Sequence, residues 1–365
     1  MMTSKERMMA AVNREKPDRL PVTIHQWQQY HLDTYMHGMT DIEANRWAGF
    51  DAAITVFEAT EPDTPDWRVT ATKGRKDGYD TVHYHIETPE GPLSYTVAGN
   101  AMTTWVTEHM IKEEEDIQLL RKYRPVPKLN KQKVYEVYDA LGDDGIVRSF
   151  VCGNQGGCWQ DACELFGVTD MIMATFENPE WVHEFMQILL EKKLAFIEES
   201  MAGMPFDLVE TGGGAASNTV ISPTIHREFC LPYDRQMHDA LKREGFKTVY
   251  HTCGGMTKIL DLILQNGCDC SETLSPAAMG GDITDTETGR MVFETMHPHV
   301  GLIGGMDQFH MLEEATPEEI RKETARLFDV FGRDGGYILS ACDHFFKAPP
   351  ENLRAFAEAA KEFRY

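Results

Sequence analysis

Short apolar segments alternate with longer amphipathic segments along most of the chain. Eight of the apolar segments are rich in aliphatic and β-branched residues and have the length of strands. They cover residues 20–24, 52–58, 145–151, 206–210, 249–253, 268–272, 299–307 and 336–341. Short strands that alternate with helices predict a parallel sheet that is buried on both faces. Eight such units in one chain favour an α/β fold of the (β/α)8 (TIM) barrel type over an open doubly wound sheet.

The ends of several helices are marked by local signals. A helix capped by Thr3 or Ser4 and running to about Asn13 is predicted to turn Met8 inward and Arg7 outward. The run at 316–319 has a Thr at the cap, a Pro at the first helical position and a Glu at the third, which predicts a helix start. No Gly-x-Gly-x-x-Gly motif follows the first strand, which argues against a dinucleotide-binding fold.

The residue pattern changes between Trp67 and about Thr107. Segments of alternating β-branched and aromatic residues dominate there, and turn residues at 77–78 and 90–92 separate these segments. This pattern predicts an antiparallel β-hairpin or meander, residues 67–107, inserted into the barrel. We expect one domain, residues 1–365, that contains this insertion.

Composition and charge narrow the function. Hydrophobic residues make up 42% of the 365 residues and charged residues 25%, which is typical of globular proteins. The net charge of −23 argues against nucleic acid and against anionic membrane surfaces as partners. No apolar run approaches the roughly 20 residues of a membrane span. Residues 1–7 are polar and lack the apolar core of a signal peptide, so we expect a cytoplasmic protein.

The chain has eight cysteines, which are scattered through apolar or glycine-rich segments. Without a secretory signal, this distribution favours free thiols or metal ligands over a disulfide framework.

Candidate chemistry gathers where the predicted strands end, which is where barrels place their active sites. His251 and Cys253 lie two residues apart on one strand and therefore face the same side. An imidazole nitrogen and a thiolate sulfur that converge suit zinc. The other polar residues at strand ends are Glu58, Cys152, Asn154, Gln155, Glu210, Glu272, Asp307, Cys342, Asp343 and His344.

The residues His251, Cys253 and Cys342 would give zinc three protein ligands and leave one position open for substrate. Glu272, at the end of the neighbouring strand, is the candidate for a labile fourth ligand. The alternative is a pair of buried thiols beside a His that bonds to the backbone. For Glu272 the alternative is an ion pair with a nearby Lys or Arg.

Several motifs give the chain a resemblance to the uroporphyrinogen decarboxylase superfamily along nearly its whole length. They are residues 4–7 with 17–22, 222–223 with 231–233, 251–254, 304–307, and 337–342 with 350–353. The His-x-Cys pair with a late Cys is similar to the zinc-dependent methyltransferases of that superfamily. Those enzymes work with corrinoid proteins, as the methylcobalamin:coenzyme M methyltransferases do.

This resemblance implies a methyltransferase that moves a methyl group between a corrinoid (cobalamin) protein and a small-molecule donor or acceptor. Carried over by position, His251, Cys253 and Cys342 are the zinc ligands, and Glu272 matches a fourth ligand more loosely. Zinc would activate the substrate, for which a thiol acceptor is favoured. We take Glu210 and His344 as candidate catalytic residues. The candidate contacts of the corrinoid cofactor are Asn154, Gln155 and Gly213.

Two alternatives stay open. One is a metal-free decarboxylase of the same superfamily, which would need a basic pocket for its polyanionic substrate. Residues 23–30, just after the first strand, contain no Arg where the decarboxylases bind carboxylates, and this counts against that alternative. The other is a zinc barrel without catalytic activity that binds only a corrinoid or a partner protein.

Overall fold

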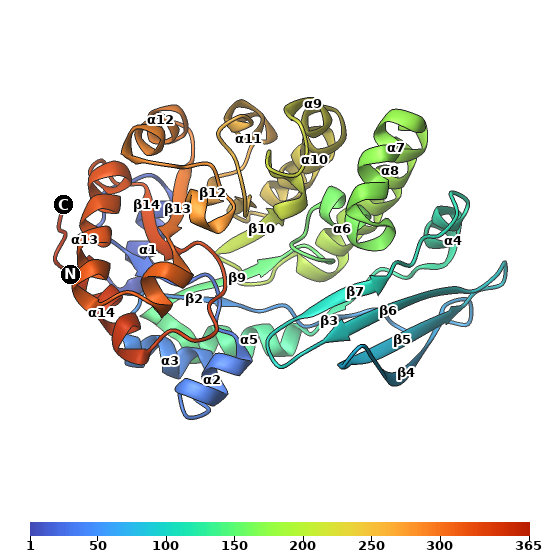
Figure 1. Ribbon diagram of the computed structural model, residues 1–365, viewed down its shortest axis with the longest axis horizontal. Coiled ribbons are helices and arrows are strands. Elements are labelled where there is room, and N and C mark those ends of the chain that lie inside the picture. The colour runs from blue at the N-terminus through green and yellow to red at the C-terminus, as the bar shows by residue number, and fades with distance from the viewer.

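Eight parallel strands form the central barrel of the protein (Figure 1). The computed structural model describes residues 1–365, and the strands follow one another in the order β1, β14, β13, β12, β11, β10, β9, β2. Their bounds are β1 Val22–Thr23, β2 Ala52–Thr55, β9 Gly145–Phe150, β10 Leu208–Gly212, β11 Thr248–His251, β12 Cys270–Thr273, β13 Gly301–Met306 and β14 Tyr337–Ala341. A hydrogen bond of 2.8 Å from Asp51 N to Val22 O links the two ends of the sheet. The predicted (β/α)8 barrel and its eight strand segments are confirmed.

Helices surround the barrel (Figure 1). The α-helices are α1 Ser4–Val12, α2 Gln29–Tyr35, α3 Asp41–Ala48, α4 Asp116–Tyr123, α5 Lys131–Leu141, α6 Cys158–Phe166, α7 Val168–Glu177, α8 Pro179–Phe196, α9 Pro223–Ile225, α10 Leu231–Arg243, α11 Leu260–Asn266, α12 Thr286–Met296, α13 Pro317–Leu327 and α14 Pro350–Lys361. Shorter 3-10 or π turns are η1 Gly142–Asp144, η2 Ile197–Met201, η3 Gly214–Ala216, η4 His226–Cys230, η5 Ala277–Met279, η6 Gln308–Glu313 and η7 Phe328–Gly332. The capping box predicted at Thr316 is present at the start of α13. No helix combines the length and the apolar content that crossing a bilayer requires.

The barrel interior is built in two layers. The lower layer is apolar and is closed by Met8, Ala11 and Val12 of α1. Its strand residues are Ala53, Ile146, Leu208, Val249, Cys270, Ile303 and Ile338. Because side chains on a strand repeat their direction every second residue, the next inward positions lie one layer closer to the C-terminal rim. Those positions include Arg148, Glu210, His251, Glu272 and Ser340, so a polar layer stands on the apolar one.

The predicted antiparallel insertion is present, and it is larger than a hairpin. Strands β4 (Arg68–Lys76), β5 (Tyr79–Glu87), β6 (Leu93–Gly99) and β7 (Thr104–Glu108) form a four-stranded sheet. At its base, β3 (Ala59–Thr60) pairs with β8 (Lys128–Leu129). The insertion follows β2 and therefore leaves from the C-terminal face of the barrel (Figure 1). That the barrel and this sheet form one domain stays a prediction.

The outward direction predicted for Arg7 is wrong. Its side chain is buried because Asp51, which is fully buried at the start of β2, needs cationic partners. Arg7 Nη1 lies 2.6 Å and Arg19 Nη1 lies 2.9 Å from the Asp51 carboxylate oxygens. Backbone N–H of Val22 and the Ser4 hydroxyl donate to the same carboxylate. Asp51 thus ties α1 to the first two strands.

The substitution Asp51→Ala should lower the free energy of unfolding by about 3 kcal/mol, because it removes the carboxylate that pairs with Arg19 and one of the two that pair with the buried Arg7. Denaturant unfolding followed by circular dichroism measures this loss. The exposed Asp33→Ala variant is the matched control and should stay within about 0.5 kcal/mol of the wild type. Equal stabilities of the two variants would contradict the role of Asp51.

Candidate functional site

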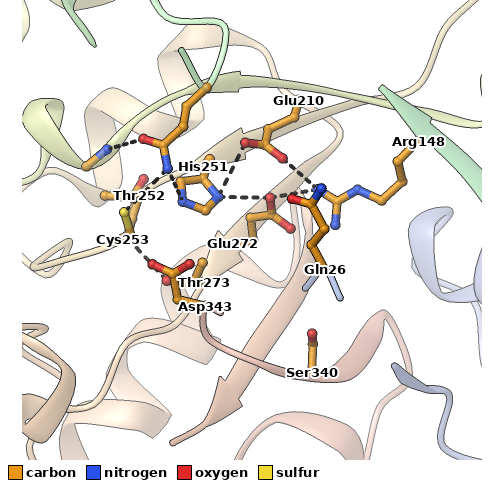
Figure 2. Close-up of polar contacts among 12 residues, drawn as sticks. Gln26, Arg148, Glu210, His251, Thr252, Cys253, Glu272, Thr273, Ser340 and Asp343 are labelled. Carbon is orange, nitrogen blue, oxygen red and sulfur yellow. Dashed lines mark hydrogen bonds and ion pairs between the residues drawn. The ribbon is translucent and has the colours of Figure 1, made fainter. Parts of the chain in front are cut away.

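Four charged or titratable side chains form the polar layer of the barrel, and each comes from a different neighbouring strand (Figure 2). Arg148 of β9 lies between two carboxylates: its Nη2 is 2.7 Å from Glu272 Oε1 and 3.1 Å from Glu210 Oε2. His251 Nδ1 is 3.0 Å from Glu272 Oε1 and 3.6 Å from Glu210 Oε1. All four residues are buried.

The surroundings make the two carboxylates different. Burial raises the pKa of Glu210 to about 7, although His251 and Arg148 oppose the shift. Burial acts in the same direction on Glu272, but Arg148 and the hydrogen bond with His251 hold its pKa well below the usual range. Burial lowers the pKa of His251, and the charges of Cys253 and Glu210 with its hydrogen bonds raise it well above the usual value. Glu272 is therefore the ionised partner that accepts the Nδ1–H of His251.

The opposite edge of the His251 ring faces Cys253 and Gln155. Gln155 Nε2 is 3.2 Å from His251 Nε2 and 3.8 Å from Cys253 Sγ. A histidine that binds a metal through one ring nitrogen usually donates its other N–H to a carboxylate. The Glu272–His251 pair has this form, with Nε2 turned toward the thiol, and metal binding there would release the Nε2 proton. The pair therefore fits a zinc ligand and the carboxylate that orients it.

Cys342 has a different environment from the one predicted. It follows the last residue of β14, and its Sγ faces the backbone oxygen of Leu274 at 3.8 Å. Burial raises the pKa of its thiol. Neither Cys342 nor Cys253 belongs to a group of three or more His, Cys, Asp or Glu residues with ligand atoms within 4.8 Å of one another. The structure thus joins His251 with Glu272 but leaves Cys342 apart, and the zinc role of the thiols stays a prediction.

Two such groups do exist, and they share His25. The first contains His25, Glu210, His251 and Glu272, and the second contains His25, Asp343 and His344. Burial lowers the pKa of His25 to about 3, so its ring is neutral. Its ring centroid lies 5.1 Å from that of His251 and 5.3 Å from that of His344. His344, a predicted catalytic residue, is thus connected to the site through His25.

The other predicted residues lie around this centre or away from it. Asn154 is exposed, and its backbone N–H donates to Asp161. Gly213 has a φ of +138°, and a Cβ there would lie 2.6 Å from Gln160 Oε1. Two rim residues have other roles: Glu58 is exposed and bonds Asn130, and Asp307 caps η6.

Sequence reasoning missed His25 and Arg148. Both left a signal: His25 directly follows the first predicted strand, and Arg148 is a charged residue inside an apolar strand segment. A charge in a buried strand needs a partner, so it indicates polar groups on the neighbouring strands.

A buried cluster of titratable side chains at the C-terminal half of a (β/α)8 barrel defines an enzyme-type site. Comparison with known proteins identifies the family. The family model described as Uroporphyrinogen decarboxylase (URO-D) matches residues 95–363. The chain therefore belongs to this family of enzymes.

The relatives of this chain are named as methyltransferases or as decarboxylases. The chain is 26% identical over 201 residues to a methylated-thiol–coenzyme M methyltransferase of Methanosarcina mazei, and the match covers 55% of this chain and 50% of that protein. It is 21% identical to the methylcobamide:CoM methyltransferase MtbA of Methanosarcina acetivorans, covering 100% of this chain and 99% of that protein. A uroporphyrinogen decarboxylase of Hydrogenovibrio crunogenus is 26% identical over 51% of this chain and 50% of its own length.

A solved structure matches the fold of this protein over nearly its whole length. A solved methyltransferase from Methanosarcina mazei superposes with a TM-score of 0.69 at 16% identity, covering 99% of both chains. At this identity the likeness supports the barrel fold alone.

A second buried polar network supports β11 from outside the barrel. Tyr250, the residue before His251, donates from its hydroxyl to Asp234 Oδ2 at 2.9 Å, and His226 Nε2 lies 3.1 Å from the same hydroxyl. Burial raises the pKa of Asp234 to about 7, although the Tyr250 bond and the charge of Lys193 oppose the shift. Under mildly acidic conditions, Asp234 is therefore protonated in the folded protein but ionised in the unfolded chain.

A group with a raised pKa in the folded state makes the protein less stable as the pH rises from about 4 to about 7, by about 1.4 kcal/mol per pH unit at most. The variant Asp234→Asn keeps an acceptor for Tyr250 and should lose this dependence. Its stability relative to the wild type should therefore increase between those pH values, as measured by denaturant unfolding. The exposed Asp239→Asn variant on the same helix, α10, controls for surface charge. Parallel pH curves for wild type and Asp234→Asn would refute the assignment.

Proposed function

We propose that the protein is a zinc-dependent methyltransferase that moves a methyl group between a corrinoid protein and a small-molecule substrate. The observation that carries this proposal is the His251 ring, which is held by Glu272 on one edge and presents its other edge to the Cys253 thiol. The full-length relationship to a methylcobamide:CoM methyltransferase supports it.

Zinc would be held by His251, Cys253 and Cys342. To bind one ion, His251 and Cys253 need the Gln155 amide, whose nitrogen lies 3.2 Å from Nε2 and 3.8 Å from Sγ, to leave room between them. Cys342 must turn away from Leu274 O to reach the same ion. Glu272 was predicted as a fourth ligand, but its bonds to Arg148 and His251 favour a role as the carboxylate that orients the imidazole. Bound zinc would hold a substrate thiol as its thiolate at neutral pH.

The other residues of the site supply positioning and proton transfer. Glu210, with a pKa of about 7, is suited to take the proton of a substrate thiol near neutral pH. His344, which lies 3.3 Å from Gln26 and beside Asp343, is the candidate general acid at the rim. Burial lowers the pKa of its imidazole, which works against this role, and the Asp343 carboxylate partly offsets the shift. The corrinoid would approach the C-terminal face, where Asn154, Gln155 and Gly213 lie on the loops after β9 and β10.

A decarboxylase is the second candidate, since several relatives of that name match half of the chain. Such an enzyme needs free cationic groups for a polyanionic substrate. In this barrel the buried Arg148 is already bonded to Glu210 and Glu272, and the segment after β1 has no Arg. The site therefore favours methyl transfer.

Metal content tests the proposal most directly. Elemental analysis of the wild type should find about one zinc per chain, and Cys253→Ala and Cys342→Ala should each lose it, because removing a thiolate leaves too few ligands. The zinc-loaded wild type should then demethylate methylcobalamin with one of a panel of thiols. Absence of zinc after supplementation would reject the proposal and turn attention to porphyrin binding.

The variant Glu272→Gln separates an orienting role from a ligand role. An orienting carboxylate predicts that zinc stays at about one per chain while the affinity falls about 10- to 100-fold. Competition with a chromogenic chelator measures the affinity, and the exposed Glu58→Gln variant is the control. Zinc content that drops to that of Cys253→Ala would identify Glu272 as a ligand.

A further inference from the structure

Gln155 is held in an unusual position against the proposed zinc ligands. It has a left-handed backbone with a φ of 51°, a conformation that favours glycine. Its Oε1 accepts a hydrogen bond of 3.1 Å from the backbone N–H of Gly214. This bond fixes which end of the amide is the donor, so the NH2 group is directed at Cys253 Sγ, 3.8 Å away. His251 Nε2 lies 3.2 Å from the same nitrogen and can accept from it only when the ring carries its proton on Nδ1 alone.

The loop that carries Gln155 is anchored from behind by a buried ion pair. Lys193 of α8 is almost fully buried, and its Nζ lies 2.6 Å from Asp161 Oδ2. Lys193 also donates to the backbone oxygen of Cys152, and Asp161 accepts the backbone N–H of Asn154 at 2.7 Å. A Cβ on Gly153 would lie only 2.0 Å from the Asp161 carboxylate, so the loop passes directly over this pair.

In the proposed reaction, the Cys253 sulfur would compete with the substrate for the methyl group. The substrate thiolate must attack a methyl group, and Cys253 presents a second thiolate to the same space. Seven of the eight cysteines are buried, and Cys253 is the exception. A hydrogen bond to a thiolate stabilises its charge, and a less basic thiolate is a weaker nucleophile.

We propose that Gln155, positioned by the Lys193–Asp161 pair, protects the Cys253 sulfur from methylation and so directs the methyl group to the substrate. This role rests on the proposed function. In the suppressed side reaction, the Cys253 thiolate forms a carbon–sulfur bond with the methyl group while the carbon–cobalt bond breaks. The electron pair of that bond stays on cobalt, which is reduced from Co(III) to Co(I), and no proton moves. The resulting thioether has lost its negative charge and is a poorer zinc ligand.

Methyl iodide tests this role without a corrinoid partner. The zinc-supplemented full chain is treated with it, and mass spectrometry of the Cys253 peptide follows the gain of one methyl group. Gln155→Ala should methylate about three- to tenfold faster than wild type, because losing a hydrogen bond to a charged group changes thiolate basicity by about 10- to 150-fold and nucleophilicity follows about half of that change on a logarithmic scale. Gln155→Glu should do the same, since a carboxylate cannot donate. Gln187→Ala, on the surface of α8, is the matched control.

The anchor is tested by Lys193→Met, which should give a rate between those of wild type and Gln155→Ala. Loss of zinc should follow methylation of Cys253 in every variant. Equal methylation rates of wild type and Gln155→Ala would overturn the protecting role. A Lys193→Met rate equal to wild type would overturn the anchor. Failure of the wild type to bind zinc or to demethylate methylcobalamin would instead reject the proposed function, while the methyl iodide rates would still report on Gln155.

Discussion

Arg148 is the permanently charged side chain that makes the polar layer of the barrel possible. It bonds to both Glu210 and Glu272, two carboxylates that would repel each other if they were buried alone. Because Arg148 keeps Glu272 ionised, Glu272 accepts the Nδ1–H of His251. The direction of the imidazole, and hence the access of Nε2 to Cys253, follows from this chain of contacts.

The barrel supports that chain by its layering. An apolar layer, closed by α1, packs directly below the charged residues. The loops after β9, β10 and β11 lie at the C-terminal side of the same residues. Gln155 and Gly214 come from two of these loops and meet beside Cys253. A site assembled from several strand ends can keep its fold while its loops change, which explains how one barrel serves different reactions.

The relatives illustrate the same point. Methyltransferases and decarboxylases match this chain at similar low identities, so percentage identity alone does not choose between them. The match to the methylcobamide:CoM methyltransferase extends over the whole chain, whereas the decarboxylase match covers half of it. The choice depends on the site. The arginine of this site is already neutralised by two carboxylates, so the site is poorly suited to a polyanion. A histidine that faces a thiol suits a soft metal ion such as zinc.

The sequence by itself determined the eight strands and the insertion, because strand alternation and helix capping are local properties. Cys253 lies two residues beyond the end of β11, so its position beside His251 was decided by the tertiary structure. Tertiary structure decided which residues meet across strands. The parallel register places His251 beside Glu272, and Arg148 reaches Glu272 across two intervening strands, a contact that no local pattern encodes. Cys342 lies just beyond the last residue of β14, where strand alternation no longer fixes the direction of a side chain, so its orientation toward Leu274 was decided by packing.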